Sequence, residues 1–377
     1  MKLPRIDFLV CSIFFVIAAP AWSGQAEIAL EEGLRLHEAG KPKEAIREYD
    51  RAVKANPKLA EAYFNRGNAY YDLGQNEQAV KDYSEVIRLS PKDAEAYFNR
   101  GNAYRRLKKD DLALKDFSAA IKIEPQEAKN YINRGSIHFD ARRYDAALKD
   151  FGEALRLNPK DAEAFYNRGN CYLALDQKAE AIRDYDEALS LDPSLVDAYY
   201  NRGIAHADSA QYENAIRDFD EVLVRNPKSS NAFYNRALSK AKTDRYEAAV
   251  EDYSEAMRLN PKDSEAPFNR GRAYLRLQQF DLAARDFTEV IVIQPRNADA
   301  LVYRGIARIY QRKEKEADAD FQKAFQLNPA LKKKLQPIID DAKAKAKWSP
   351  TGKPVGRNVE HEPPAKAGAQ VEGPAQP

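Results

Sequence analysis

Several features that would point to a common class of function are scarce in this 377-residue sequence. Only two cysteines occur, Cys11 and Cys171, and the first lies in an N-terminal segment that we expect to be removed. The mature chain therefore has no internal disulfide framework. The 60 Lys and Arg residues are balanced by 58 Asp and Glu residues. This balance argues against a nucleic-acid-binding protein, which would need an excess of positive charge.

Catalytic and metal-binding signatures are also missing. The four histidines do not form a metal-ligand pair at helical spacing. There is no phosphate-binding glycine loop, no nucleophile elbow and no metalloprotease motif. The sequence therefore predicts a protein that is not an enzyme and that has no cofactor and no metal site.

Long apolar runs are limited to the N-terminus. Lys2 and Arg5 precede an apolar run from Phe8 to Ala19, and small residues follow it. This layout predicts a secretory signal peptide over residues 1–21, because about 12 apolar residues are too few to cross a bilayer. We expect an exported protein, most simply in a bacterial periplasm, with no stable membrane span after cleavage. An uncleaved N-terminal anchor remains an alternative.

Internal repetition dominates the rest of the chain. The tripeptide Asn-Arg-Gly recurs at steps of 34 residues or multiples of 34, starting at Asn65. Prolines keep the same interval from Pro57 to Pro329. Nine repeats therefore run over residues 26–331 without an insertion, and a period of this length indicates a repeat array. A lysine-rich segment over residues 332–347, preceded by Ala330 and Leu331, is predicted to be a capping helix. The proline-rich residues 348–377 are predicted to be disordered.

Each repeat has the pattern of a helical hairpin. In the second repeat, apolar residues recur at spacings of three and four over residues 60–73 and again over 77–89, with Gly74 between them. Ser90 and Pro91 follow, and we expect them to supply the capping hydroxyl and the first-turn proline of the next helix.

The conserved spacing within the repeats resembles the tetratricopeptide repeat family over about four-fifths of the chain. A small residue stands at the eighth position, Ala at the twentieth, an aromatic residue at the twenty-fourth and Pro at the thirty-second. The resemblance implies an all-α, right-handed α-solenoid of nine helix-turn-helix repeats, with a concave face lined by the first helix of each repeat. Cys171, His138 and His206 replace packing residues of this pattern, so we expect them to lie in the core.

Two rows of residues on the first helices are candidates for peptide binding. The sixth position carries asparagine in seven successive repeats: Asn65, Asn99, Asn133, Asn167, Asn201, Asn235 and Asn269. The fifth carries bulky apolar residues: Phe64, Phe98, Ile132, Tyr166, Tyr200, Tyr234 and Phe268. The asparagine row is similar to that of the O-linked N-acetylglucosamine transferase, which implies contact with the backbone of an extended peptide. Both rows also fit packing between repeats, and for the fifth position we prefer partial exposure.

A third row pairs charges sixteen residues apart. Arginine at the seventh position, from Arg66 to Arg304, precedes aspartate at the twenty-third, from Asp82 to Asp320. We interpret these as structural ion pairs between the two helices of a repeat.

The leading functional prediction is a scaffold that holds a protein partner, as an extended polypeptide, in the concave groove. Acidic residues at the second position, such as Glu61 and Glu163, argue against a clamp for a terminal carboxylate. Two alternatives stay open: a glycan-binding module of cell-envelope polysaccharide assembly, and a structural spacer that binds through its convex face.

Overall fold

The computed structural model describes residues 24–347, and every regular element in that range is an α-helix. The predicted signal peptide and the predicted C-terminal tail lie outside the described residues. None of the described helices is both long enough and apolar enough to cross a membrane.

Two helices form each repeat, and we call them the A helix and the B helix. The A helices are α1 (Gln25–Glu38), α3 (Ala60–Asp72), α5 (Ala94–Arg106), α7 (Ala128–Asp140), α9 (Ala162–Ala174), α11 (Val196–Asp208), α13 (Ser230–Lys242), α15 (Glu265–Arg276) and α17 (Ala298–Tyr310). The B helices are α2 (Pro42–Ala55), α4 (Asn76–Leu89), α6 (Asp110–Ile123), α8 (Tyr144–Leu157), α10 (Lys178–Leu191), α12 (Tyr212–Arg225), α14 (Tyr246–Leu259), α16 (Phe280–Ile293) and α18 (Glu314–Leu327). The predicted hairpin repeats are thus confirmed over the described residues.

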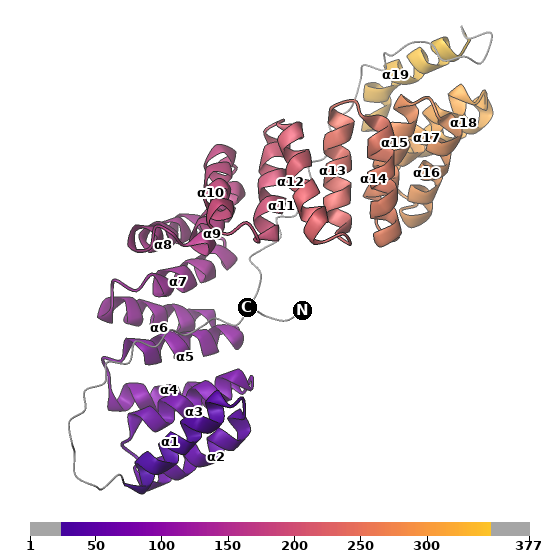
Figure 1. Ribbon diagram of the computed structural model, residues 1–377. Coiled ribbons are helices and arrows are strands. Elements are labelled where there is room, and N and C mark those ends of the chain that lie inside the picture. The colour runs from indigo at the N-terminus through magenta and orange to yellow at the C-terminus, as the bar shows by residue number, and fades with distance from the viewer. Residues whose placement is uncertain (1–23, 348–377) are drawn as a thin grey trace. The chain divides into compact units, whose positions relative to one another are not determined.

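The chain divides into two compact units between Asn130 and Tyr131. The first unit holds α1 to α6, and the second holds most of α7 and all the helices from α8 to α19 (Figure 1). Inside each unit an A helix packs against the B helix of its own repeat and against the B helix of the preceding repeat. We call the contact between a B helix and the following A helix a joint.

Alanine at the twentieth position and an aromatic ring at the twenty-fourth fill the interior of every repeat. Ala215 and Phe219 are completely buried in the sixth repeat, for example. Glycine at the eighth position leaves room for this ring in the sixth repeat, because a Cβ atom added to Gly203 would lie 2.9 Å from a ring carbon of Phe219. In the seventh repeat, Ala237 takes the same position. The small residues at these positions therefore allow the two helices of a hairpin to approach closely.

The turn between the A and B helices contains one residue with a left-handed backbone. In the first two repeats this residue is Gly40 or Gly74, each with a φ of 72°. The later repeats place a non-glycine residue there, with φ between 55° and 61°: Lys108, Arg142, Asp176, Ala210, Asp244, Gln278 and Arg312. The turn therefore keeps the same geometry in the repeats that lack glycine, at some cost in backbone strain.

The predicted cap of the third A helix is wrong. Ser90 and Pro91 lie in the connection that follows α4, and α5 begins at Ala94. The N-cap is Asp93, whose Oδ1 accepts a hydrogen bond from the backbone N–H of Ala96 at 2.8 Å. The carboxylate of Asp93, and not the hydroxyl of Ser90, thus accepts a hydrogen bond from a free backbone N–H group in the first turn of α5.

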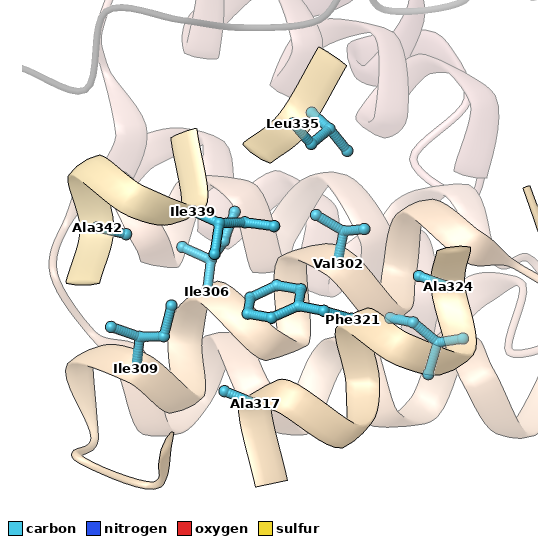
Figure 2. Close-up of a cluster of buried hydrophobic side chains, with 10 residues drawn as sticks. Val302, Ile306, Ile309, Ala317, Phe321, Ala324, Leu335, Ile339 and Ala342 are labelled. Atoms are coloured by element: carbon cyan, nitrogen blue, oxygen red, sulfur yellow. The ribbon is translucent and has the colours of Figure 1, made fainter. Parts of the chain in front are cut away.

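After the ninth repeat, α19 (Ala330–Lys347) packs on the last hairpin. Leu335, Ile339 and Ala342 are buried in one cluster with residues of α17 and α18, among them Ile306 and Phe321 (Figure 2). Figure 2 shows Ile339 lying directly over Ile306. The apolar face of the terminal repeat is therefore covered by α19, and this helix begins two residues before the predicted start at 332.

Candidate interaction surface on the A helices

The fifth-position side chains lie at the edge of the core of their own repeat. Each aromatic residue in this row contacts the twenty-fourth-position ring, as in the pair Tyr200 and Phe219, whose ring centroids are 5.9 Å apart. Tyr166 and Tyr200 are buried, so the expected partial exposure is wrong for these two. The expectation holds for the other members, which are half-buried: Phe64, Phe98, Ile132, Tyr234 and Phe268.

The asparagines of the second unit bond mainly to the preceding repeat. The Nδ2 group of Asn235 donates to the hydroxyl oxygen of Tyr200 at 3.0 Å, and that of Asn269 donates to Tyr234 at 3.0 Å. Both groups also donate to a backbone carbonyl of their own helix. Asn201 donates to the hydroxyl of Tyr166 at 3.3 Å. The two N–H bonds of such an amide are therefore occupied within the chain.

A further asparagine row at the ninth position was not predicted. Asn170 Oδ1 accepts from the Tyr185 hydroxyl at 2.7 Å and from Asn201 Nδ2 at 2.9 Å, so it joins two repeats. Asn68 makes the same two contacts with Tyr83 and Asn99 in the first unit. The sequence signal for this row is weak because the ninth position is not asparagine in every repeat.

Asn167 is the exception among these amides. It is only 6 % exposed, and its side chain makes no hydrogen bond to any residue of the described chain, although its amide atoms still reach solvent. The reason lies in the preceding repeat, where the fifth position is Ile132, which has no hydroxyl. The ninth position there is Ser136, which donates to the backbone oxygen of Ile132. Both intramolecular partners of the asparagine are thus missing at this joint.

The predicted pairs of arginine and aspartate are confirmed. In each, Nε and Nη2 of the arginine donate to the two carboxylate oxygens, as between Arg168 and Asp184 at 2.7 Å each. These hydrogen bonds raise the pKa of the Arg168 guanidinium above its usual value, against the opposing effect of burial. The aspartates are buried: Asp82, Asp116, Asp150, Asp184, Asp218, Asp252, Asp286 and Asp320. The two helices of a repeat are therefore linked by charge-assisted hydrogen bonds.

The remaining nitrogen of the arginine, Nη1, links neighbouring repeats, which the sequence did not reveal. It donates to the twenty-fifth-position side chain of the preceding B helix at distances of 2.6–3.2 Å. The acceptors are Asp50, Ser84, Asp186, Asp220, Ser254 and Thr288.

Acidic side chains accompany the asparagines along the A helices. Every acidic residue at the second position is exposed: Glu27, Glu61, Glu95, Glu163, Asp197, Glu265 and Asp299. This surface carries negative charge beside its amides and aromatic edges, so neutral or basic segments are electrostatically better suited to it than acidic ones.

The histidines and the cysteine that were expected in the core lie largely there. Cys171 is fully buried, and burial raises the pKa of its thiol to about 12, so it is not a reactive thiolate. His206 is 9 % exposed, and its Nδ1 lies 2.6 Å from Oε1 of Gln211. His138 is half-buried, and desolvation lowers the pKa of its imidazole. Among the described residues, no group of three or more His, Cys, Asp or Glu side chains could hold a metal ion.

Comparison with protein families finds the same repeat along most of the chain. The model described as tetratricopeptide repeat matches residues 132–196, 200–264 and 268–330, and a second model with this description matches residues 94–127. A model described as TPR repeat matches residues 33–74 and 67–108. No curated protein matches the chain.

Several solved structures of helical repeat proteins are similar to this chain at low sequence identity, and one of them has a TM-score above 0.5. The C-terminal part of a TPR repeat-containing protein from Cytophaga hutchinsonii is 18 % identical, with a TM-score of 0.54, over 63 % of this chain and 97 % of that one. PilF of Pseudomonas aeruginosa is 19 % identical, with a TM-score of 0.49, over 55 % and 94 %. YrrB, a TPR protein with an unusual peptide-binding site, is 24 % identical, with a TM-score of 0.46, over 50 % and 96 %.

Proposed function

Since the chain belongs to the tetratricopeptide repeat family, we propose that it is a non-enzymatic protein-interaction scaffold that binds an extended polypeptide along its A helices. The observation that supports this most directly is the side chain of Asn167. Its amide is held on the scaffold, reaches solvent and has no hydrogen-bonding partner in the described chain. An amide of this kind matches a peptide group, because each offers one N–H donor and one C=O acceptor to the other.

Other A-helix residues of the second unit suit the same ligand. Tyr234 and Phe268 are half-buried, so their exposed edges offer apolar contact to side chains of a bound segment. The exposed acids at the second position favour a neutral or basic segment. The asparagines that already bond within the chain, such as Asn235, would retain their carbonyl oxygens for a backbone N–H of the ligand. They would contribute less than Asn167.

The test is affinity capture from a cell-envelope extract with the chain over residues 22–377, followed by affinity measurement on the polypeptide recovered. Asn167→Ala should weaken binding about tenfold, as expected for the loss of two hydrogen bonds of about 0.7 kcal/mol each. Asn235→Ala, in which the lost amide also bonds within the chain, is the matched variant and should change the affinity less. The combined Asn133, Asn167 and Asn201 to Ala variant should remove most of the binding.

Unchanged affinity in a folded triple variant would refute peptide binding by this row. Capture of oligosaccharide in place of polypeptide would favour the glycan-binding alternative. Equal retention of one polypeptide by the parent and the triple variant would move the site to the B helices.

We also propose that the protein is exported to a periplasm, on the basis of the basic and apolar pattern of residues 1–21. Cell fractionation with N-terminal sequencing of the recovered protein tests this. A mature N-terminus near residue 22 in the periplasmic fraction is expected. An intact Met1 in the cytoplasmic fraction would refute export.

A further inference from the structure

The joint between α8 and α9 lacks the polar link that the arginine row makes at other joints. Arg66, Arg202 and Arg236 each donate through Nη1 to an aspartate of the preceding B helix, at 2.6–2.7 Å. Arg100, Arg270 and Arg304 donate to a serine or threonine hydroxyl in the same place. Arg168 makes no such bond to the described chain, because the corresponding residue of α8 is Gly152.

The guanidinium of Arg168 is nevertheless held in the same orientation as the others. Nε and Nη2 are fixed by Asp184, and the guanidinium carbon lies 5.5 Å from the ring centroid of Phe165 and 5.9 Å from that of Tyr172. Its side chain is 23 % exposed, as is that of Arg134, against 16–19 % for Arg66, Arg202 and Arg236. The Nη1 group is thus a preorganised donor that remains accessible to a partner.

Open space lies where the missing acceptor would stand. A Cβ atom added to Gly152 would have no heavy atom within 4 Å apart from its chain neighbours and the backbone of its own helix. We call the region bounded by Gly152, Arg168 and Lys149 the Gly152 slot. Lys149 precedes Gly152 by three residues on α8, so the two share one helix face. It is exposed and forms no ion pair with the described residues.

The charges at the slot favour an acidic occupant. At the joint between α2 and α3, Arg66 is paired with two carboxylates, those of Asp82 and Asp50. At the Gly152 slot, Arg168 is paired with Asp184 alone. An exposed cation three residues before the acceptor position is present at both joints, as Arg47 on α2 and Lys149 on α8. One carboxylate fewer therefore makes the joint between α8 and α9 more positive than the joint between α2 and α3.

We propose that the Gly152 slot binds an aspartate or glutamate side chain of a protein partner. The partner's carboxylate would take the place that Asp50, Asp186 and Asp220 occupy at their joints, and would accept hydrogen bonds from Nη1 of Arg168 and from Lys149. This site lies at the joint between α8 and α9, next to the pair of Arg168 and Asp184, and does not depend on polypeptide binding by the asparagine row. It gives the scaffold a second contact region with the opposite charge preference.

The test follows the side-chain Nε–Hε resonances of the arginines in the full-length protein by NMR, with N-acetyl-aspartate N-methylamide as the probe. The Arg168 signal, assigned from its loss in Arg168→Lys, should shift saturably. The neutral asparagine analogue should bind at least threefold more weakly. Gly152→Asp, which supplies the carboxylate within the chain, should abolish the response of Arg168.

The chain also provides a gain-of-function control. Asp186→Gly removes the acceptor of Arg202 and should create a second responsive arginine, with an affinity within threefold of that of Arg168. The proposal fails if Arg168 does not respond in the parent, if it responds equally in Gly152→Asp, or if the asparagine analogue binds as tightly as the acid. Because Asp186→Gly tests the same geometry at another joint, a failure of Gly152→Asp to fold leaves the proposal open to refutation.

Discussion

Replacement of Asp184 by Asn should destabilise the fifth repeat more than the same change destabilises a repeat whose arginine also bonds an aspartate of the preceding B helix, as Arg66 does. Asp184 is 5 % exposed and accepts two hydrogen bonds of 2.7 Å from Arg168. An asparagine offers one acceptor oxygen and turns an N–H group toward the guanidinium. Arg168 would then lie partly buried without any carboxylate.

The expected loss of stability can be estimated from the structure by comparing Asp184→Asn with Asp82→Asn. Removal of one member of a buried ion pair costs about 3–5 kcal/mol, and the partial exposure of Arg168 places Asp184→Asn near the lower end, at about 3 kcal/mol. In Asp82→Asn, Arg66 keeps its 2.6 Å contact with Asp50, whose side chain is 52 % exposed. A half-exposed pair contributes about 0.5–1 kcal/mol, so this variant should lose about 2 kcal/mol.

Native-state hydrogen exchange is the suitable assay, because it reports the free energy of local opening for each pair of helices in an array. Amides of α9 and α10 are compared between the parent and Asp184→Asn, and amides of α3 and α4 between the parent and Asp82→Asn. Circular dichroism checks that both variants retain their helices. A loss in Asp82→Asn that equals or exceeds the loss in Asp184→Asn would refute the reasoning, as would losses below about 1 kcal/mol in both.

Four further substitutions have expected directions. Tyr49→Phe should stabilise the first repeat by about 1 kcal/mol, because the buried Tyr49 hydroxyl has no hydrogen-bond partner. Tyr185→Phe should destabilise the fifth repeat, because the Tyr185 hydroxyl donates to Asn170. The urea midpoint of each variant is compared with that of the parent. Ala210→Gly should raise the urea midpoint by relieving the left-handed φ of 57°, worth about 1 kcal/mol, and no gain would contradict that strain. His138 has a lowered pKa through desolvation, so its stabilising contribution is complete above about pH 6.5 and is lost as the pH falls toward the folded-state pKa. His138→Gln should therefore lose less stability than the parent between pH 7.5 and 5.5, and equal losses would refute this.

The repeat architecture could be predicted because residues of the same type recur at each packing position in all nine repeats. Ala215 under Phe219, and Gly203 beneath the same ring, are explained by the contacts of one hairpin with itself. The pair of Arg168 and Asp184 is likewise internal to one repeat, and its spacing of sixteen residues follows from the antiparallel hairpin. The periodicity of the sequence therefore predicts the contacts that form between the two helices of one repeat.

Contacts between repeats were harder to predict because they depend on residues 16 to 35 positions away that vary from repeat to repeat. Asn235 and Asn167 stand in the same Asn-Arg motif, yet Asn235 donates to the hydroxyl of Tyr200, whereas the residue at the corresponding position before Asn167 is Ile132, which has no hydroxyl. The cap of α5 was missed for a related reason. Asp93 and Ser90 can both cap a helix, and only the backbone decides which one lies at the N-terminus.

In an array of near-identical repeats, binding specificity can therefore arise from the differences between joints. The joint between α8 and α9 differs from others on two sides at once, since Asn167 lacks an internal partner for its amide and Arg168 lacks one for Nη1. These residues are adjacent in sequence, and the cause in each case is a residue of the preceding repeat, Ile132 or Gly152. Both changes leave a polar donor held in place without an internal acceptor, and such a donor gains most from a partner that supplies one. Binding specificity in this protein is therefore to be sought in the residues that break the repeat pattern at this joint, since the repeated motif itself is occupied with holding the fold together.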